Sequence, residues 1–277
     1  MTFLAPAKIN LSLRVLGRRA DGFHDIESLM CPVSLFDSLE ITARQEGGLE
    51  FVCDDSTLPA SEENLVVRAA RLFCDSCGIE PHLTIELTKR IPQGAGLGGG
   101  SSDAATTLIA LDHLFETQLE RSALAAMGAD LGSDIPFFIY QSAGVIGGRG
   151  ERVTPVGFPH SLPLLLVKPP FGVPTPWAYG KWKDSIEVPK VPYAAQSFPW
   201  GELVNDLERP VFEKYLFLAL LKRWLIEQPE AAGALMSGSG ATVFAVLKDK
   251  GSAIALGERV IREFGENLWL CACETVA

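Results

Sequence analysis

The sequence lacks the long apolar runs on which membrane proteins depend. No run approaches the roughly 18 residues of a membrane span, and the apolar stretch Leu162–Val167 is only long enough for a strand. The first residues, Met1–Pro6, show no basic region followed by an apolar segment, as a secretory signal would. We therefore expect a cytoplasmic protein with no membrane contact.

Positive charge is also scarce. The chain has 24 lysines and arginines against 34 aspartates and glutamates, which gives a net charge of -10 at neutral pH. Because nucleic acids bind basic surfaces, this balance predicts no nucleic-acid partner. It leaves room for a single nucleotide, since backbone N–H groups can bind phosphate without any net positive charge.

Cysteine is sparse, with six in 277 residues. Cys74 and Cys77 have the spacing of half a zinc site, which Cys271 and Cys273 would complete. The pattern favours another interpretation, because Cys74 and Cys77 continue the apolar side of an expected helix, where free thiols pack as small hydrophobes. We expect reduced thiols and identify no metal ligands.

Glycine, by contrast, is concentrated in the stretch Ile91–Ala105, where five of the seven positions from Gly94 to Gly100 are glycine. Residues 83–87 before it alternate as a strand does, and residues 104–115 after it place apolar side chains on one helical face. Strand, glycine loop and helix N-terminus together form an anion-binding arrangement. The pattern predicts a phosphate-binding loop, with Ser101, Ser102 or Asp103 capping the helix.

The loop differs from two well-known phosphate motifs. Gly94–Gly99 matches the dinucleotide pattern GxGxxG, but a second helix follows where that fold requires a strand. No Gly-Lys-Ser/Thr ends the loop, so it is not a P-loop. The phosphate charge must then be met by backbone donors, a metal ion or lysines from elsewhere.

The rest of the chain reads as alternating helices and strands without internal repeats. Prolines become frequent after residue 155, which suggests a domain boundary near 156–160. Residues 171–200 are expected to be mostly loop, and a loop of that length is often functional. The predicted helices span about 61–77, 120–127, 211–227 and 252–264, and the predicted strands span 5–15, 37–41, 49–52, 162–168, 242–247 and 268–273.

Lys8 and Asn10 fall on the same side of the strand at 5–15, together with Ser12 and Arg14. Asp134 comes directly before Ile135-Pro136, at a junction between a loop and the next element. Both observations have ordinary alternatives: a half-exposed strand for the first, and a turn or capping aspartate for the second.

Three motifs resemble those of the GHMP small-molecule kinases. Pro92–Ala105 is similar to their central phosphate-binding motif, Met236–Thr242 to their third motif and Pro6–Leu11 to their first. Residues 19–24, 131–138, 173–176 and 205–208 add a resemblance to one branch, which phosphorylates a cytidine diphosphate derivative of methylerythritol in the non-mevalonate isoprenoid pathway. Since the matches occur in the same order as in the family and over most of the chain, the protein is identified as a member of this superfamily.

The resemblance implies an α+β, two-domain GHMP kinase fold. Residues 1–156 would form a domain like ribosomal protein S5 domain 2 that carries the ATP loop. Residues 157–277 would form a ferredoxin-like domain, with the substrate cleft between the two. The resemblance further implies an ATP-dependent kinase that uses Mg²⁺ and works as a monomer or weak homodimer.

The resemblance also assigns roles to residues of this sequence. Asp134 would accept the proton of the acceptor hydroxyl, and Lys8 would orient Asp134 and stabilise the emerging alkoxide. The adenine would lie near Asn64, Leu65 and Lys89. The triphosphate would lie on Pro92, Gln93, Gly94, Ala95, Gly96, Leu97, Gly98, Gly99, Gly100, Ser101 and Ser102, where Ser101 or Ser102 could also contact Mg²⁺.

The cytidine end of the substrate falls, by the same resemblance, on Phe23, His24 and Tyr179. The two aromatic rings would enclose the base and His24 would read its edge, while Asn10 and Thr175 would contact the methylerythritol and phosphate portions. Relatives usually carry Tyr at the first aromatic position and Phe at the second, so here the hydroxyl has moved to the other side of the cleft.

Two other functions are compatible with parts of this pattern. A GHMP kinase for mevalonate or homoserine would need the glycine loop but not the base-binding residues Phe23, His24 and Tyr179. A non-catalytic nucleotide-responsive or RNA-contacting protein could use the same fold, although the acidic charge and the presence of both Lys8 and Asp134 argue against it.

Overall fold

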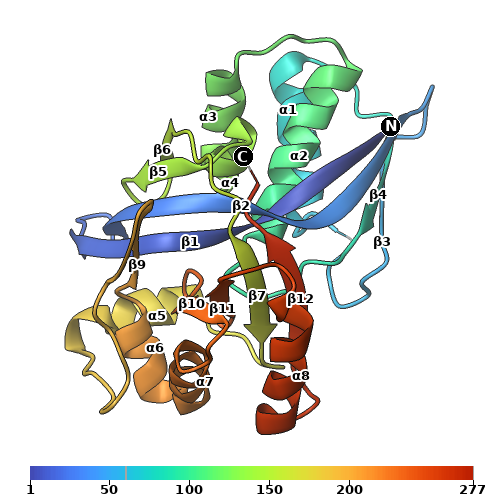
Figure 1. Cartoon of the computed structure of the whole chain (residues 1–277). Coiled ribbons are helices and arrows are strands. Elements are labelled where there is room, and N and C mark those ends of the chain that lie inside the picture. The colour runs from blue at the N-terminus through green and yellow to red at the C-terminus, as the bar shows by residue number, and fades with distance from the viewer. Residues whose placement is uncertain (60, 277) are drawn as a thin grey trace.

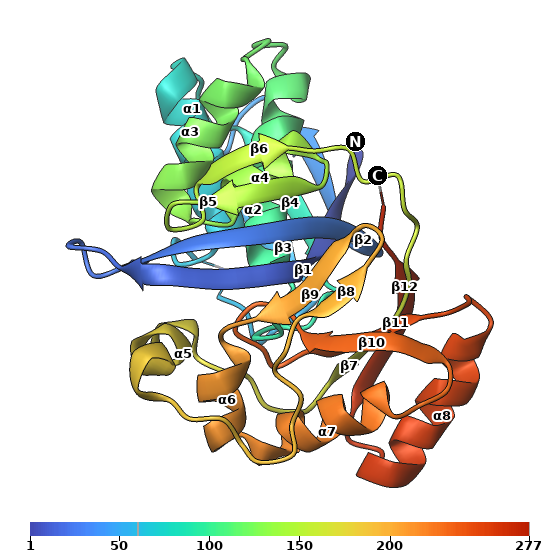
Figure 2. The same ribbon diagram turned by 60° about the vertical axis from the view of Figure 1, so that its left-hand side comes forward.

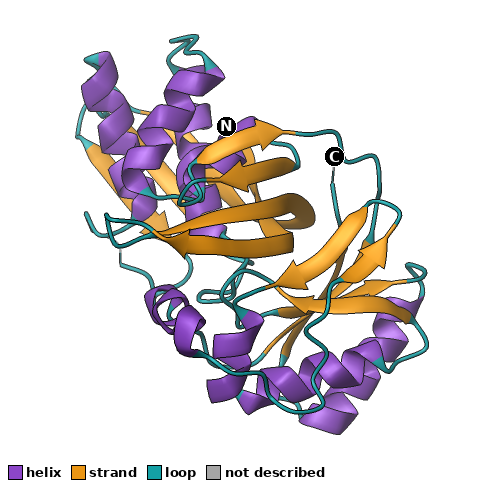
Figure 3. Cartoon of the chain, turned by 90° about the vertical axis from the view of Figure 1, so that its left-hand side faces the viewer, coloured by secondary structure: helices purple, strands orange, loops and turns teal. Residues whose placement is uncertain are grey.

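The computed structural model describes residues 1–59 and 61–276, which form two β-sheets flanked by helices (Figure 1). Helices α1 to α4 lie on one side of the molecule and α5 to α8 on the opposite side, with the sheets between them (Figure 2). The colouring by secondary structure shows this layering most directly (Figure 3). The expected α+β class is confirmed.

The first sheet has eight strands and is built around the long hairpin of β1 and β2. Its strand order is β3-β4-β2-β1-β9-β8, and β5 and β6 join beside β2. β1 runs antiparallel to β2 and parallel to β9. The strands are β1 (Thr2–Arg18), β2 (His24–Ala43), β3 (Leu49–Cys53), β4 (Leu83–Thr88), β5 (Gly144–Gly147), β6 (Arg152–Pro155), β8 (Gln196–Phe198) and β9 (Gly201–Asn205).

The second sheet has four antiparallel strands in the order β10-β11-β7-β12. They are β7 (Pro163–Lys168), β10 (Ala231–Met236), β11 (Val243–Leu247) and β12 (Trp269–Glu274). The expected boundary between residues 156 and 157 falls between β6 and β7, which belong to different sheets, while β8 and β9 return to the first sheet. The division into 1–156 and 157–277 stays a prediction.

Most of the helices agree with the sequence pattern, and Asn64 caps α1 by accepting a hydrogen bond from the Val66 N–H at 2.9 Å. In the described part of the chain, none of the helices is long and apolar enough to cross a membrane. The helices are α1 (Leu65–Cys77), α2 (Gly99–Leu114), α3 (Arg121–Leu131), α4 (Ile135–Tyr140), α5 (Thr175–Lys181), the 3₁₀ turn η1 (Trp182–Asp184), α6 (Glu208–Lys214), α7 (Leu216–Ile226) and α8 (Ser252–Phe264).

Two of the expected helix bounds are wrong. α3 does not stop at Gly128 but continues to Leu131, because Gly128 lets the helix pack closely on Ile135. The helix expected over 211–227 is two helices, broken at Tyr215, whose φ and ψ of -108° and 68° are not helical. The stretch 171–200 is mostly loop, as expected, and also contains α5, which begins directly after Pro174.

β1 is more buried than an ordinary half-exposed strand. Ile9 and Leu11 lie in one hydrophobic cluster and Leu13 in another, and Lys8 and Asn10 are themselves buried. A β-bulge between Asn10 and Ser12 shifts the register, so the strict alternation ends there. Consequently Leu13, rather than Ser12 or Arg14, follows Lys8 and Asn10 along the wall of the main cavity.

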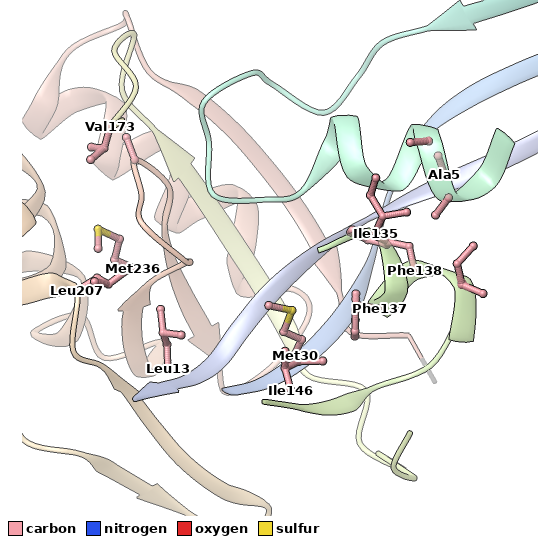
Figure 4. Close-up of a cluster of buried hydrophobic side chains, with 14 of the residues drawn as sticks. Ala5, Leu13, Met30, Ile135, Phe137, Phe138, Ile146, Val173, Leu207 and Met236 are labelled. Carbon is pink, nitrogen blue, oxygen red and sulfur yellow. The ribbon is translucent and has the colours of Figure 1, made fainter. Parts of the chain in front are cut away.

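The larger hydrophobic cluster connects the two sheets. Figure 4 shows Phe137 and Phe138 of α4 packing toward Met30, while Leu207 and Met236 approach from the other side of β1. This packing fixes the position of α4, and therefore of Asp134 at its start, relative to β1.

Candidate active site

A cavity of about 1550 Å³ brings together segments that lie far apart in the sequence. Its wall is formed by β1, the β1–β2 turn, the glycine loop before α2, the start of α4, α5, and the loop between β10 and β11. The residues predicted to bind ATP or substrate or to act in catalysis all line it except Ser102, which is fully buried.

The glycine loop ends one position before α2 begins at Gly99. Gly98 is the N-cap, with a φ of 73°, and no side-chain hydrogen bond caps the helix within the described residues. The expectation that Ser101, Ser102 or Asp103 would cap the helix is wrong, because all three lie inside the helix. The N–H groups at this end are therefore available to an anion.

The loop between β10 and β11 holds the glycine loop in shape. The N–H groups of Ala241 and Thr242 donate to the carbonyl oxygens of Gly94 and Ala95 at 3.3 and 3.1 Å. The two loops approach so closely that a Cβ on Gly96 would lie 2.1 Å from the Ser237 carbonyl oxygen. The phosphate loop thus depends on both sheets.

Asn205 and Glu208 fix that second loop in turn. The Asn205 amide donates to the carbonyl oxygens of Met236 and Gly238 at 2.7 and 2.8 Å. The Glu208 carboxylate accepts from the Met236 N–H at 2.9 Å and forms a buried ion pair with Lys222. The motif at 205–208, which resembles one in the family, therefore holds the loop between β10 and β11 in shape.

Lys8 and Asp134 meet in the cavity, with Lys8 Nζ 3.6 Å from Asp134 Oδ2. Lys8 Nζ also donates to Asn10 Oδ1 at 2.7 Å, which confirms that Lys8 and Asn10 share one side of β1. Burial lowers the pKa of the Lys8 ammonium and outweighs the opposing effect of Asp134. Asp134 precedes α4 but forms no capping side-chain hydrogen bond in the part of the chain that is described, so its carboxylate is not used as a cap.

Lys89, predicted near the adenine, lies between two buried carboxylates. Its ammonium contacts Asp37 and is 2.7 Å from Asp103 Oδ2. Burial alone would lower the pKa of Lys89, but the two carboxylates outweigh it and raise that pKa. Asp37 also accepts from the Ile91 N–H at 2.8 Å, which ties the start of the glycine loop to β2.

Two polar groups beneath the loop have no partner among residues 1–59 and 61–276: the Ser102 hydroxyl and Asp103 Oδ1. Both residues are almost fully buried near the start of α2. Burial raises the pKa of Asp103 to about 7. Oxygen atoms of this kind suit a cation that arrives with a nucleotide.

The aromatic residues gather at the other end of the cavity. The ring of His24 lies 5.4 Å from that of Tyr179 and 6.2 Å from that of Trp182. Burial and the nearby Arg18 lower the pKa of His24, and burial raises the pKa of the Tyr179 hydroxyl. Phe23 is 48% exposed, and the guanidinium of Arg149 lies over its ring. The enclosure of a base between Phe23 and Tyr179 stays a prediction.

Sequence reasoning gave no individual role to several residues in or beside this site, namely Asp37, Arg149, Trp182 and Ser239, although Ser239 lies within the motif Met236–Thr242. Asp37 looks like any strand aspartate, and Trp182 lay in a stretch assigned to loop. Arg149 stands in the glycine-rich turn between β5 and β6, and the glycines were the available signal. Ser239 lies 2.8 Å from the Thr175 hydroxyl, a contact that joins α5 to the second loop.

Comparison with known proteins places the chain among enzymes of one kind. The GHMP kinases N terminal domain matches residues 64–142, and the GHMP kinases C terminal domain matches residues 197–267. The 4-diphosphocytidyl-2-C-methyl-D-erythritol kinase of Methylacidiphilum infernorum is 43% identical over 87% of this chain and 84% of its own length. That of Syntrophotalea carbinolica is 38% identical over 95% of both chains.

Solved structures agree. The crystal structure of a 4-(cytidine 5'-diphospho)-2C-methyl-D-erythritol kinase superposes with a TM-score of 0.82 at 35% identity, covering 100% of both chains. A homoserine kinase from Cytophaga hutchinsonii superposes with a TM-score of 0.69 at 19% identity, over 99% of this chain and 95% of its own, and shares the fold alone.

Proposed function

Because this chain belongs to the GHMP kinases, and among them to the family of 4-diphosphocytidyl-2-C-methyl-D-erythritol kinases, we propose that it phosphorylates that cytidyl substrate. Membership of the family makes it an ATP-dependent small-molecule kinase. The product would be the 2-phosphate, made in the non-mevalonate route to isoprenoid precursors.

One observation carries the proposal: the Lys8–Asp134 pair lies directly against the glycine loop. The Lys8 N–H donates to the Leu97 carbonyl oxygen at 2.9 Å. A Cβ on Gly98 would lie 3.1 Å from Lys8 Cγ. A phosphate held by the loop would therefore have its outer end beside Lys8 and Asp134.

We assign the proton transfer to Asp134. Its side chain is 35% exposed to the cavity and 3.6 Å from Lys8, so an acceptor hydroxyl can reach it. General base catalysis of this kind contributes about 10²–10⁴ in rate. Lys8 would orient the carboxylate and stabilise the alkoxide, a role that buried charge favours because the local dielectric is low.

ATP fits the arrangement of the glycine loop, since glycine at Gly96 and Gly98 allows positive φ values and close packing against Ser237 and Phe138, which leaves backbone N–H groups free for phosphate. Mg²⁺ would bind with the nucleotide, through the Ser101 or Ser102 hydroxyl, and would neutralise phosphate charge. Asn64, Leu65 and the Asp37–Lys89–Asp103 cluster would border the adenine side.

The other half of the cavity would hold the cytidyl end. Phe23, His24 and Tyr179 would contact the base, and Asn10 and Thr175 the portion near the reacting hydroxyl. Their positions along the cavity support this order, because Asn10 is bonded to Lys8 while Phe23 stands at the far, more exposed end.

The test is an assay of ADP release with ATP and one acceptor at a time: the cytidyl substrate, mevalonate or homoserine. We expect turnover with the cytidyl substrate alone. ADP release with mevalonate or homoserine, and none with the cytidyl substrate, would show that another kinase activity of the superfamily is the correct one.

A further inference from the structure

The turn between β5 and β6 brings an arginine to the wall of the cavity. Gly148 and Gly150 flank Arg149 with φ values of 69° and 125°, which glycine adopts without strain. The Ile26 N–H donates to the Gly148 carbonyl oxygen at 2.8 Å. A Cβ on Gly150 would lie 3.8 Å from Asp134 Oδ1. The turn is therefore fixed between the aromatic end of the cavity and Asp134.

The Arg149 side chain is half-buried and held in place. Its guanidinium carbon lies 5.1 Å from the centre of the Phe23 ring, and Nη2 donates to the Ala129 carbonyl oxygen at 3.2 Å. A guanidinium has five N–H donors, and a stacked, anchored one keeps its remaining donors in a fixed plane. Such a group is suited to a bidentate contact with phosphate oxygens.

The charges around the cavity single out this residue. Five basic side chains line it: Lys8, Arg18, Lys89, Arg149 and Lys183. Lys8 and Lys89 are paired with carboxylates, and Arg18 and Lys183 are exposed. Within the two described ranges, Arg149 forms no ion pair, so it is the half-buried cation left for an anionic ligand.

We propose that Arg149 binds the diphosphate of the cytidyl substrate and thereby favours a nucleoside diphosphate over a plain nucleoside. The inference rests on the proposed function. In that substrate the diphosphate joins the base end to the alcohol end, and Arg149 stands between Phe23 and Asp134, where those two ends would lie.

The test compares binding of CDP and of cytidine to the intact enzyme and to Arg149→Ala. Losing a charged hydrogen bond to the diphosphate should weaken CDP binding roughly 10- to 100-fold while changing cytidine binding less than about threefold. Arg149→Lys keeps the charge but not the planar guanidinium. Its affinity for CDP should lie between that of the intact enzyme and that of Arg149→Ala. The KM for ATP should not change. Arg152→Ala is the matched control, because it removes one positive charge from the same hairpin at an exposed position outside the cavity.

Equal losses for CDP and cytidine would overturn the inference, since they would mean that Arg149 acts only by supporting Phe23. An unchanged affinity for CDP, or a change confined to ATP, would overturn it as well. Thermal unfolding of each variant shows that the comparison concerns folded protein. If the unaltered enzyme binds neither CDP nor cytidine, the proposed function itself fails, a result distinct from the failure of Arg149 alone.

Discussion

The Ser237 hydroxyl donates a hydrogen bond to the Gly96 carbonyl oxygen at 2.9 Å, across 141 positions of the chain. It also lies 3.4 Å from the Asn10 N–H, so one side chain contacts both the phosphate loop and the strand that carries Lys8. The glycine loop and the strand that carries Lys8 are thus positioned by the same loop of the second sheet.

Gly96→Ala should disrupt this contact. Gly96 has a φ of 72°, and the added methyl group would meet the Ser237 carbonyl oxygen at 2.1 Å. We expect a loss of roughly 2 kcal/mol or more in the free energy of unfolding, and weaker ATP binding. Urea unfolding measures the first and nucleotide titration the second. Gly157→Ala, where an added Cβ meets no described atom within 4 Å, is the control and should behave like the parent.

Asp134→Asn should lower kcat by about 10²–10⁴ while leaving the KM for ATP nearly unchanged, because the amide cannot accept the proton of the hydroxyl. Steady-state kinetics checks both values. Asp130→Asn, an exposed substitution near the end of α3, should have normal kinetics. A near-normal kcat in Asp134→Asn would remove Asp134 as the base.

His24→Ala should raise the KM for the cytidyl substrate and leave the KM for ATP unchanged, because the ring lies at the aromatic end of the cavity beside Tyr179. Since burial and Arg18 lower the pKa of His24, the ring is neutral at pH 7 and above, and we expect this KM to be constant from pH 7 to pH 8. His160→Ala, at an exposed position, serves as the control. An unaltered KM for the cytidyl substrate in His24→Ala would place the base elsewhere.

Asp103→Asn should change how stability depends on pH. Burial raises the pKa of Asp103 to about 7 in the folded chain, against about 3.9 in an unfolded one. Its contribution to stability is therefore complete below about pH 4 and is lost as the pH rises through about 7. Asparagine does not titrate, so the variant should lose less unfolding free energy than the parent between pH 5 and pH 8.

The expected difference is at least about 1 kcal/mol, which corresponds to less than one pKa unit. Urea unfolding at the two pH values gives it directly, and titrating groups far from Asp103 cancel in the comparison with the parent. Identical pH dependence in both proteins would show that Asp103 does not titrate in this range.

Local patterns in the sequence predicted the elements of the site well. The glycine loop lies between β4 and α2 as expected, and Lys8 and Asn10 share a side because alternation is a local property of a strand. The family assignment was also predictable, since each of the family's motifs is one continuous stretch of sequence. The bulge after Asn10 was not, because it depends on pairing with β2.

The supporting contacts could not be predicted, because they join distant positions. Asp37 acquires its role only when β2 meets Lys89, 52 positions later. Asn205 was noticed as part of a motif, but its contact with the carbonyl oxygens of the second loop depends on how β9 lies beside β10. Such residues are ordinary in sequence and gain their function through packing.

The bonds from Ala241 and Thr242 to the glycine loop also bear on protein synthesis. The ribosome releases Gly94 and Ala95 long before the donors that hold them, so the nucleotide site is one of the last parts of the chain to be completed. A product truncated before residue 241 would carry every residue of the phosphate loop and lack the contacts that shape it. We therefore expect such a product to bind nucleotide far more weakly than the full chain.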